Sequence, residues 1–178
     1  MSNIKIETER LILRPPILED LQAFTKMRSD FVRSAQAGGG LDAAGAWSKF
    51  TSWVGGWQLY GFGMFSVIEK SSGAWIGNIG PVNMFSWHGQ EFGWAVIEEA
   101  DGKGFAFEGA IAALDWCFKN TAFDEFVHSI SPENSSSSKL AERIGAKFIG
   151  EMILPAPYEG KIDHLWKSFK SDWNKKND

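Results

Sequence analysis

The chain has 178 residues and enough hydrophobic ones (44%) for a core without disulfides, with a formal net charge of −4 and a pI near 5.4. Because a chain of this length can bury about 70% of its unfolded surface, we expect a single domain over 1–178, with its core over 6–170 and a C-terminal tail over 171–178. The acidic balance argues against a nucleic-acid partner, whose phosphates require a basic face, and suits a cationic, amine-bearing partner.

Cysteine content and the N-terminal sequence indicate the compartment. The one cysteine, Cys117, cannot form an internal disulfide, and residues 1–6 contain no apolar secretion segment. No stretch approaches the ~20 apolar residues that a membrane helix requires. We therefore expect a cytoplasmic protein with no membrane partner.

The first half of the chain alternates strand and helix patterns. A strand is expected over 10–14, closed by two prolines, and a helix over 18–28 with apolar residues on one face. Three glycines at 38–40 predict a mobile link, after which apolar residues recur at helical spacing from 47 to 57. A β-hairpin follows, with strands over 62–68 and 74–80.

The second half continues this alternation. An alternating apolar strand over 91–97 places Glu91 on the face of the small residues Gly93 and Ala95. The remaining expected elements are a helix over 105–120, a strand over 125–131, a helix over 135–144, and strands over 147–153 and 164–169. The chain is therefore predicted to be mixed α/β.

The glycine turn, residues 101–104, is the most informative feature of the sequence. It reads Asp-Gly-Lys-Gly and opens directly into the helix expected over 105–120. The first N–H groups of a helix have no intrahelical acceptor, the helix dipole adds positive charge there, and glycines let a ligand approach the backbone. The turn therefore predicts a phosphate-bearing ligand. A dinucleotide fingerprint is excluded because Phe107 stands where its third glycine belongs, and no P-loop run is present.

The glycine turn is similar to the pyrophosphate-binding signature Gln/Arg-x-x-Gly-x-Gly/Ala of the GNAT superfamily of acetyltransferases, with Asp101 at the first position. Three further segments resemble the family in the same order. Residues 8–15 and 91–96 resemble strands of the branch related to ribosomal-protein N-terminal acetyltransferases, and residues 134–146 resemble the Asn-x-x-Ser helix. The resemblance implies a GNAT fold: a mostly antiparallel sheet of six to seven strands, splayed between strands 4 and 5, with helices on both faces.

The resemblance also implies an activity. It points to an N-acetyltransferase that uses acetyl-CoA as co-substrate and needs no metal, with direct attack by a primary amine in a ternary complex. The acceptor would be a protein N-terminal α-amine or a small-molecule amine. A catalytically silent coenzyme-A-binding module and a transferase of a different acyl group are the alternatives. Both a monomer and a homodimer are compatible with the sequence.

Glu91 is the candidate general base. An amine must be neutral to attack a thioester, and an ordinary alkylamine has a pKa near ~10.4. Glu91 resembles the acidic residue that family members place on this strand, where it takes the proton directly or through a water; a solvated strand-end residue is the alternative. Ser137 and Tyr158 are the candidates to protonate the departing thiolate.

The coenzyme-binding residues follow from the same resemblance. Backbone groups of Val96, Ile97 and Glu98 match the positions that bind the pantetheine arm, and an N–H near Ile97 would stabilise an oxyanion. Asn134 and Ser137 would lie beside this arm, although Asn134 also fits a helix cap. The pyrophosphate would be bound by Gly102, Lys103, Gly104, Phe105, Ala106 and Phe107. Lys103 also fits a solvated turn, and Asp101 is expected to cap the helix and point away from the phosphates.

Aromatic and histidine residues are the candidates for the acceptor site. Trp47, Trp53 and Trp57 are expected there, because the resemblance implies that residues 35–57 build acceptor specificity and because aromatic faces attract cations; core packing of these tryptophans is the alternative. His88 is expected at the mouth of the same groove. The histidines lack partners at metal-ligand spacing, so no metal site is expected. Cys117 is expected to be a buried packing residue.

Overall fold

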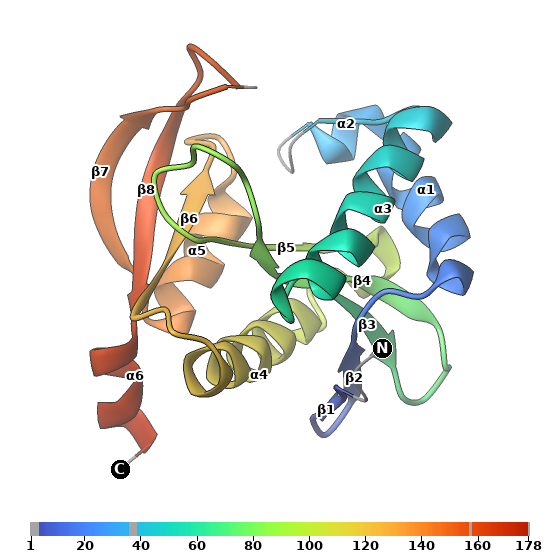
Figure 1. The fold of residues 1–178 in the computed structure, drawn as a ribbon, viewed down its shortest axis with the longest axis horizontal. Helices are drawn as coiled ribbons and strands as arrows, with labels where there is room; N and C mark the ends of the chain where they lie inside the picture. The colour runs from blue at the N-terminus through green and yellow to red at the C-terminus, as the bar shows by residue number, and fades with distance from the viewer. Residues whose placement is uncertain (1–3, 36–38, 157, 178) are drawn as a thin grey trace.

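The computed structural model describes residues 4–35, 39–156 and 158–177, and eight strands of these residues form one sheet (Figure 1). Across the sheet the order is β1-β2-β3-β4-β5-β6-β8-β7, with β5 and β6 parallel and all other neighbours antiparallel. The strands are β1 Ile6–Glu7, β2 Leu11–Arg14, β3 Phe65–Glu69, β4 Trp75–Val82, β5 Glu91–Val96, β6 Glu125–Ile130, β7 Lys147–Ile153 and β8 Ile162–Phe169. The sheet has one strand more than expected, because the two-residue strand β1 pairs with β2.

Helices cover both faces of this sheet, as predicted. They are η1 Leu18–Asp20, α1 Leu21–Ser29, α2 Phe31–Ser34, α3 Ala43–Tyr60, η2 Glu98–Ala100, α4 Phe105–Asn120, α5 Ser135–Ile144 and α6 Lys170–Asn177. One core cluster lies between the sheet and α4 and α5, and a second one joins α1 and α3 to the other face (Figure 1). None of the helices within the described ranges is both long enough and apolar enough to cross a membrane.

Helix α4 lies close to the sheet because its inner face consists of small residues. Ala110, Ala113 and Cys117 are completely buried. At Gly109, an added Cβ would stand only 2.6 Å from the Cδ1 atom of Ile79 on β4. Burial raises the pKa of the Cys117 thiol, so this cysteine is an inert packing residue, as expected.

The C-terminal segment differs from the expected tail over 171–178. It forms α6, which is helical through Asn177. Trp173 is buried and packs against Phe118 of α4, with the ring centroids 5.7 Å apart. One large apolar side chain thus anchors an otherwise polar segment to the core. Asp178, and Gly38 of the expected glycine link, lie outside the described residues.

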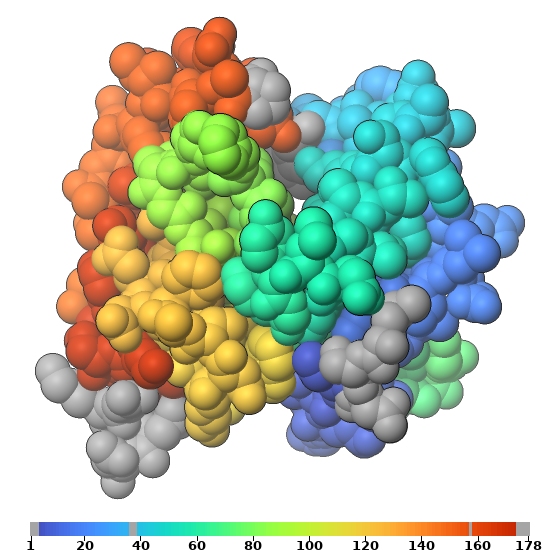
Figure 2. Space-filling model, viewed as in Figure 1, coloured from blue at the N-terminus to red at the C-terminus, as the bar shows by residue number. Residues whose placement is uncertain are grey.

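Strands β5 and β6 separate almost as soon as they meet. Their register contains one pair, Glu91 with Val127. The His128 side chain on β6 bridges the branching point, where its Nδ1 donates to the Phe92 carbonyl at 2.8 Å. This parallel, diverging pair is the splay that the family resemblance predicts. Near it, Figure 2 shows a hollow in the surface between the loop at residues 83–90 and α3.

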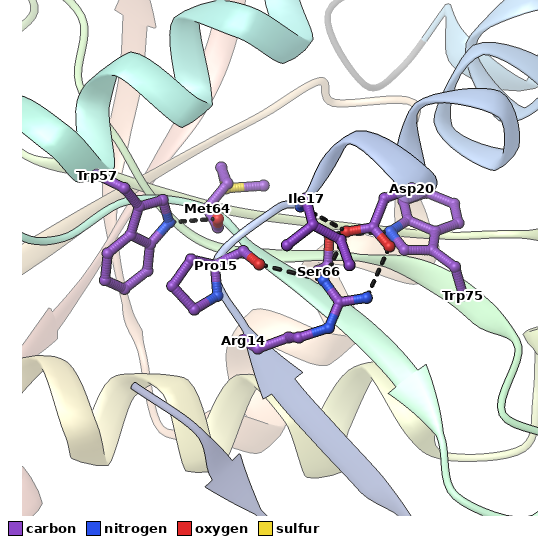
Figure 3. A network of polar contacts seen from close by, with 8 residues as sticks. All are labelled: Arg14, Pro15, Ile17, Asp20, Trp57, Met64, Ser66 and Trp75. Carbon is purple, nitrogen blue, oxygen red and sulfur yellow. Dashed lines mark hydrogen bonds and ion pairs between the residues drawn. The ribbon is translucent and has the colours of Figure 1, made fainter. Parts of the chain in front are cut away.

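Asp20 fixes the start of α1 to the sheet (Figure 3). Its buried carboxylate accepts two hydrogen bonds from the Arg14 guanidinium of β2, at 2.7 and 2.8 Å. Ser66 Oγ of β3 donates at 2.7 Å, and the backbone N–H of Ile17 donates at 3.0 Å. These donors replace the water that the carboxylate loses on burial. The network thereby sets where α1 stands over the sheet.

Candidate active site

Glu91 begins β5 and is buried, with 7% of its surface exposed, where β5 and β6 separate. The predicted alternation along this strand is confirmed. Ala95 packs with the α1–α3 cluster, whereas Phe92, Trp94 and Val96 pack with the cluster beneath α4. Glu91 therefore belongs to the face of the sheet that α1 and α3 cover.

Three donors hold the Glu91 carboxylate. The Ser129 backbone N–H donates to Oε1 at 2.9 Å, and the Ser129 hydroxyl donates to Oε2 at 2.9 Å. The indole N–H of Trp87 donates to Oε2 at 2.8 Å. Burial raises the pKa of Glu91 to about 7, although these hydrogen bonds act in the opposite direction. Glu91 is thus not a solvated strand-end residue, and a carboxylate with this pKa can accept and release a proton near neutral pH.

Glu91 opens into a cavity of about 520 Å³, the Glu91 cavity. This volume lies within the ~300–1,000 Å³ that is typical of small-molecule sites. One wall comes from α1 and α3, and the opposite wall from β5, β6 and β8. The helical wall, formed by α1 and α3, carries Arg28, Lys49 and Trp53. The strand wall, formed by β5, β6 and β8, carries Glu91, Ser129 and Asp163.

A second cavity of about 510 Å³, the Gly102 groove, runs along the glycine turn. Gly102 and Gly104 have φ angles of 69° and 81°, in the left-handed region that favours glycine. The predicted coenzyme residues that line this groove are Val96, Gly102, Gly104, Ala106, Phe107, Asn134 and Ser137. Those that do not line it are Ile97, Glu98, Lys103 and Phe105: the Lys103 side chain is exposed, and Phe105 is buried in the core.

Four cationic side chains that the sequence analysis did not single out also line the Gly102 groove: Arg28, Arg33, Lys139 and Arg143. Lys139 and Arg143 stand four residues apart on α5 and so share one helix face, a spacing that the sequence alone could have revealed. Arg33 belongs to α2, a short helix that no pattern predicted. Together these cations make the groove suitable for an anionic ligand.

Asp101 does not cap α4, contrary to expectation. Gly104 occupies the N-cap position, three residues further along the chain, and no side chain caps the helix. Asp101 lines the groove instead, with its carboxylate 2.5 Å from Nη2 of Arg33. Arg33 also donates to the Val96 carbonyl at 3.3 Å, and so spans the groove from α2 to β5. This ion pair offsets the negative charge that Asp101 brings into the groove.

The register of β5 decides which of its backbone groups face the splay. The Ile97 N–H donates to the Ile76 carbonyl of β4 at 2.9 Å, so it is not available as the expected oxyanion donor. Since backbone direction alternates along an antiparallel pair, Trp94 and Val96 direct their N–H and C=O groups away from β4, toward the splay. Sequence reasoning missed Trp94 because only the pairing with β4 reveals this direction.

The Glu91 cavity and the Gly102 groove meet at five shared residues: Arg28, Trp94, Ala95, Asn134 and Ser137. The Trp94 indole donates to Ser137 Oγ at 3.2 Å. Asn134 Oδ1 accepts from the Ser137 N–H at 3.0 Å and so caps α5, as expected. Tyr158 lines the Glu91 cavity only. Of the two candidates for thiolate protonation, the structure therefore brings Ser137 to the junction and leaves Tyr158 away from it.

Of the four residues expected at the acceptor site, Trp53 lines the Glu91 cavity, whereas Trp47, Trp57 and His88 do not. Trp57 is buried, and its indole N–H bonds to a backbone carbonyl in the core (Figure 3). Trp47 is 52% exposed on the outer side of α3. His88 lies behind the cavity wall, with Nε2 3.2 Å from Ser129 Oγ. Trp87, which the sequence analysis did not single out, also lines the cavity, because the loop before β5 turns it inward.

His128 lines the Glu91 cavity but is not a base. Its Nδ1 donates to the Phe92 carbonyl, and its Nε2 accepts from the Ser168 hydroxyl at 2.9 Å. Burial lowers the pKa of His128 to about 4, so the imidazole is neutral and both of its nitrogens are engaged. Within the described ranges, no three His, Cys, Asp or Glu side chains come together as a set that could hold a metal ion.

Comparison with known proteins agrees with this geometry. Residues 10–147 match the family model described as acetyltransferase (GNAT) domain. An uncharacterized N-acetyltransferase of Bacillus subtilis (strain 168), YnaD, is 28% identical over 112 residues. That alignment covers 62% of this chain and 66% of YnaD, so the chain matches about two thirds of this relative's length.

Solved structures extend the match along the chain. An acetyltransferase from Agrobacterium tumefaciens str. C58 superimposes with a TM-score of 0.83 and 30% identity, over 94% of this chain and 95% of that one. A putative ribosomal-protein-serine acetyltransferase from Vibrio cholerae shares the fold, with a TM-score of 0.75 and 18% identity over 94% and 98% of the two chains. Because the family model spans most of the sequence, the chain belongs to the GNAT family of acetyltransferases, which are acyltransferases.

Proposed function

We propose that the protein transfers the acetyl group of acetyl-CoA to a primary amine, with Glu91 as the general base. The observation that carries this proposal is the buried Glu91 carboxylate, with a pKa of about 7, in a cavity that adjoins the Gly102 groove at the splay. The groove suits the coenzyme, and the cavity suits the amine. The junction between them, at Trp94 and Ser137, is where the two substrates would meet.

The residues of the Gly102 groove fit acetyl-CoA. Its diphosphate would be bound by backbone N–H groups of the groove-lining residues between Gly102 and Phe107 and by the cations Arg33, Lys139 and Arg143. The splay-facing backbone groups of Trp94 and Val96 suit an arm that carries amides. When bound, acetyl-CoA supplies an acetyl group activated as a thioester.

The chain's own part in the reaction is to remove a proton. As the amine nitrogen bonds to the acetyl carbon, the carbon–sulfur bond breaks, the thiolate leaves, and the amine proton passes to the Glu91 carboxylate, directly or through a water. A pKa of about 7 leaves about half of the carboxylate ionised at neutral pH. The acetyl group passes directly to the amine, since the buried Cys117 lines neither cavity and offers no acyl-carrying thiol.

A thermal-shift measurement combined with a thiol-release assay tests the proposal. Acetyl-CoA should raise the unfolding temperature of the purified protein, and at least one amine of a panel containing small amines and peptides with free N-termini should release free thiol. Stabilisation without thiol release would support the silent coenzyme-binding module. Release with another acyl-CoA alone would support a different acyl donor, and the absence of stabilisation would overturn coenzyme binding.

Replacing Arg33 with alanine should weaken acetyl-CoA binding about three- to tenfold, because it removes a partly exposed cation from the groove. Calorimetric titration of acetyl-CoA measures the change. Lys119→Ala is the matched control, since it removes the same charge from an exposed position on α4 outside the groove. Equal dissociation constants for Arg33→Ala and the control would remove Arg33 from the coenzyme site.

Replacing Ser137 with alanine should lower kcat about three- to tenfold while leaving acetyl-CoA affinity almost unchanged. The effect is modest because a thiolate with a pKa near ~8.5 leaves tolerably well without a proton donor. Tyr158→Phe should change kcat less than twofold, since Tyr158 is away from the junction. Steady-state kinetics of both variants test this prediction. A larger loss of kcat in Tyr158→Phe than in Ser137→Ala would make Tyr158, not Ser137, the proton donor to the thiolate.

A further inference from the structure

Two cations stand on the helical wall of the Glu91 cavity. Arg28 of α1 is 3% exposed, and its guanidinium donates to the Gly39 carbonyl. Lys49 of α3 is partly buried and lines the same cavity. Burial and the neighbouring Arg28 charge lower the pKa of Lys49 to about 8, and no described carboxylate opposes this shift. At neutral pH both side chains remain charged, so an anion between them would be stabilised.

The strand wall of the cavity has the opposite character. It carries the carboxylates of Glu91 and Asp163. Asn78 of β4 also lines the cavity and is only 5% exposed, yet no described residue donates a hydrogen bond to its Oδ1. A buried amide oxygen without a partner is costly, and a hydrogen-bond donor of a bound ligand would satisfy it. Lys161 also lines the strand wall, where it lies near Asp163, so the two walls differ most at Glu91 on one side and at Arg28 and Lys49 on the other.

We propose that the acceptor is a small amine that also carries a carboxylate, of the amino-acid type, with its amine at Glu91 and its carboxylate at Arg28 and Lys49. This inference rests on the proposed function, since it names the substrate class of the same site. A cavity of about 520 Å³ accommodates such a molecule. A diamine or polyamine fits less well, because its second cation would face Lys49 and Arg28.

Matched acceptors that differ by a carboxylate alone test the proposal. Three pairs are L-lysine with cadaverine, L-ornithine with putrescine, and L-phenylalanine with phenethylamine. For the unaltered protein, kcat/KM should be about tenfold or more higher for the carboxylated member of at least one pair. Lys49→Met should reduce that preference about fivefold or more by weakening the carboxylated member, while its partner changes less than twofold.

Two further variants keep the test decisive. Lys26→Met removes the same charge from an exposed position on α1 that does not line the cavity, and it should leave the preference unchanged. Lys49→Glu should reverse the preference toward the diamines. Methionine retains the apolar stem of Lys49 and its helix propensity, and unfolding midpoints verify that each variant folds. Higher kcat/KM for the amines without a carboxylate, or an equal loss for both members in Lys49→Met, would overturn the proposal.

Measuring acceptor binding directly tests the carboxylate site independently of the acetyltransferase activity. Calorimetric titration of L-phenylalanine and phenethylamine into the protein needs no acetyl transfer. Binding of the carboxylated member, lost in Lys49→Met, would support the anion site even if no amine released thiol, in which case the acetyltransferase proposal alone would fail. Thiol release from amines without any preference for a carboxylate would leave the acetyltransferase intact and overturn the anion site.

Discussion

Replacing Glu91 with glutamine is expected to lower kcat/KM for acetyl transfer by about 10²–10⁴-fold, the range typical of a lost general base. Glutamine has nearly the same shape but cannot accept the amine proton. Ser129 and Trp87 donate to the carboxylate, and the amide retains one oxygen to accept from them. The loss should therefore appear in kcat/KM much more than in acetyl-CoA affinity, which calorimetry measures separately.

The pH dependence of the acetyl-transfer rate tests the role of Glu91 more directly than the size of the loss does. Glu91 acts as a base only when ionised, so the rate of the unaltered protein should rise through pH 7, the value to which burial raises its pKa. In Glu91→Gln that limb should disappear, and the remaining rate should keep rising toward the acceptor's own pKa, near ~10.4 for an alkylamine. Glu98→Gln, which removes a carboxylate outside both cavities, is the control. An unchanged pH profile in Glu91→Gln would remove Glu91 from the mechanism.

Replacing Asp20 with alanine is expected to lower the free energy of unfolding by about 3–5 kcal/mol, the range for breaking a buried ion pair. The substitution leaves Arg14, Ser66 and the Ile17 N–H without their common acceptor (Figure 3). Urea unfolding at pH 7, followed by circular dichroism, measures the loss. Glu19→Ala removes the same charge from the exposed neighbouring position and should change stability by less than about 0.5 kcal/mol. Similar midpoints for the two variants would contradict the network's role.

The Asp20 carboxylate also determines how the stability of the protein depends on pH in acid. Burial alone would raise the pKa of Asp20, but hydrogen bonds from Arg14 and Ser66 hold it below its usual 3.8. A folded-state pKa below the unfolded one stabilises the protein above pH 3.8, and this stabilisation is lost as the pH falls through the folded-state value. The difference in the free energy of unfolding between the unaltered protein and Asp20→Ala should therefore shrink as the pH falls below 3.8.

Local patterns in the sequence predicted most of the fold. Apolar periodicity located β5 and α4 to within a residue, because both elements bury a continuous face. It missed β1, α2 and α6, since a two-residue strand and a four-residue helix are too short to show a period and α6 is polar except for Trp173. These three elements owe their position to tertiary contacts, which no local pattern records.

The candidate site was only partly predictable for the same reason. Glu91 and Gly102 lie within motifs that are contiguous in sequence, and both were identified. Arg33, Lys49 and Ser129 reach the cavities from three separate elements, and only the assembled sheet and helices bring them there. The acceptor-site prediction for Trp57 is wrong because helical spacing cannot distinguish the face of α3 that meets the core from the one that meets the cavity.

Because β5 and β6 pair at one position only, beyond it each strand has an unpaired edge in the middle of the sheet. Unpaired strand edges usually lie at the outer border of a sheet, where they can pair with strands of other molecules. Here an amide-bearing ligand can complete the interrupted ladder and tie the two half-sheets into one unit. Cofactor occupancy would then also protect the chain against aberrant strand pairing, so the substrate would serve as part of the scaffold as well as a reactant.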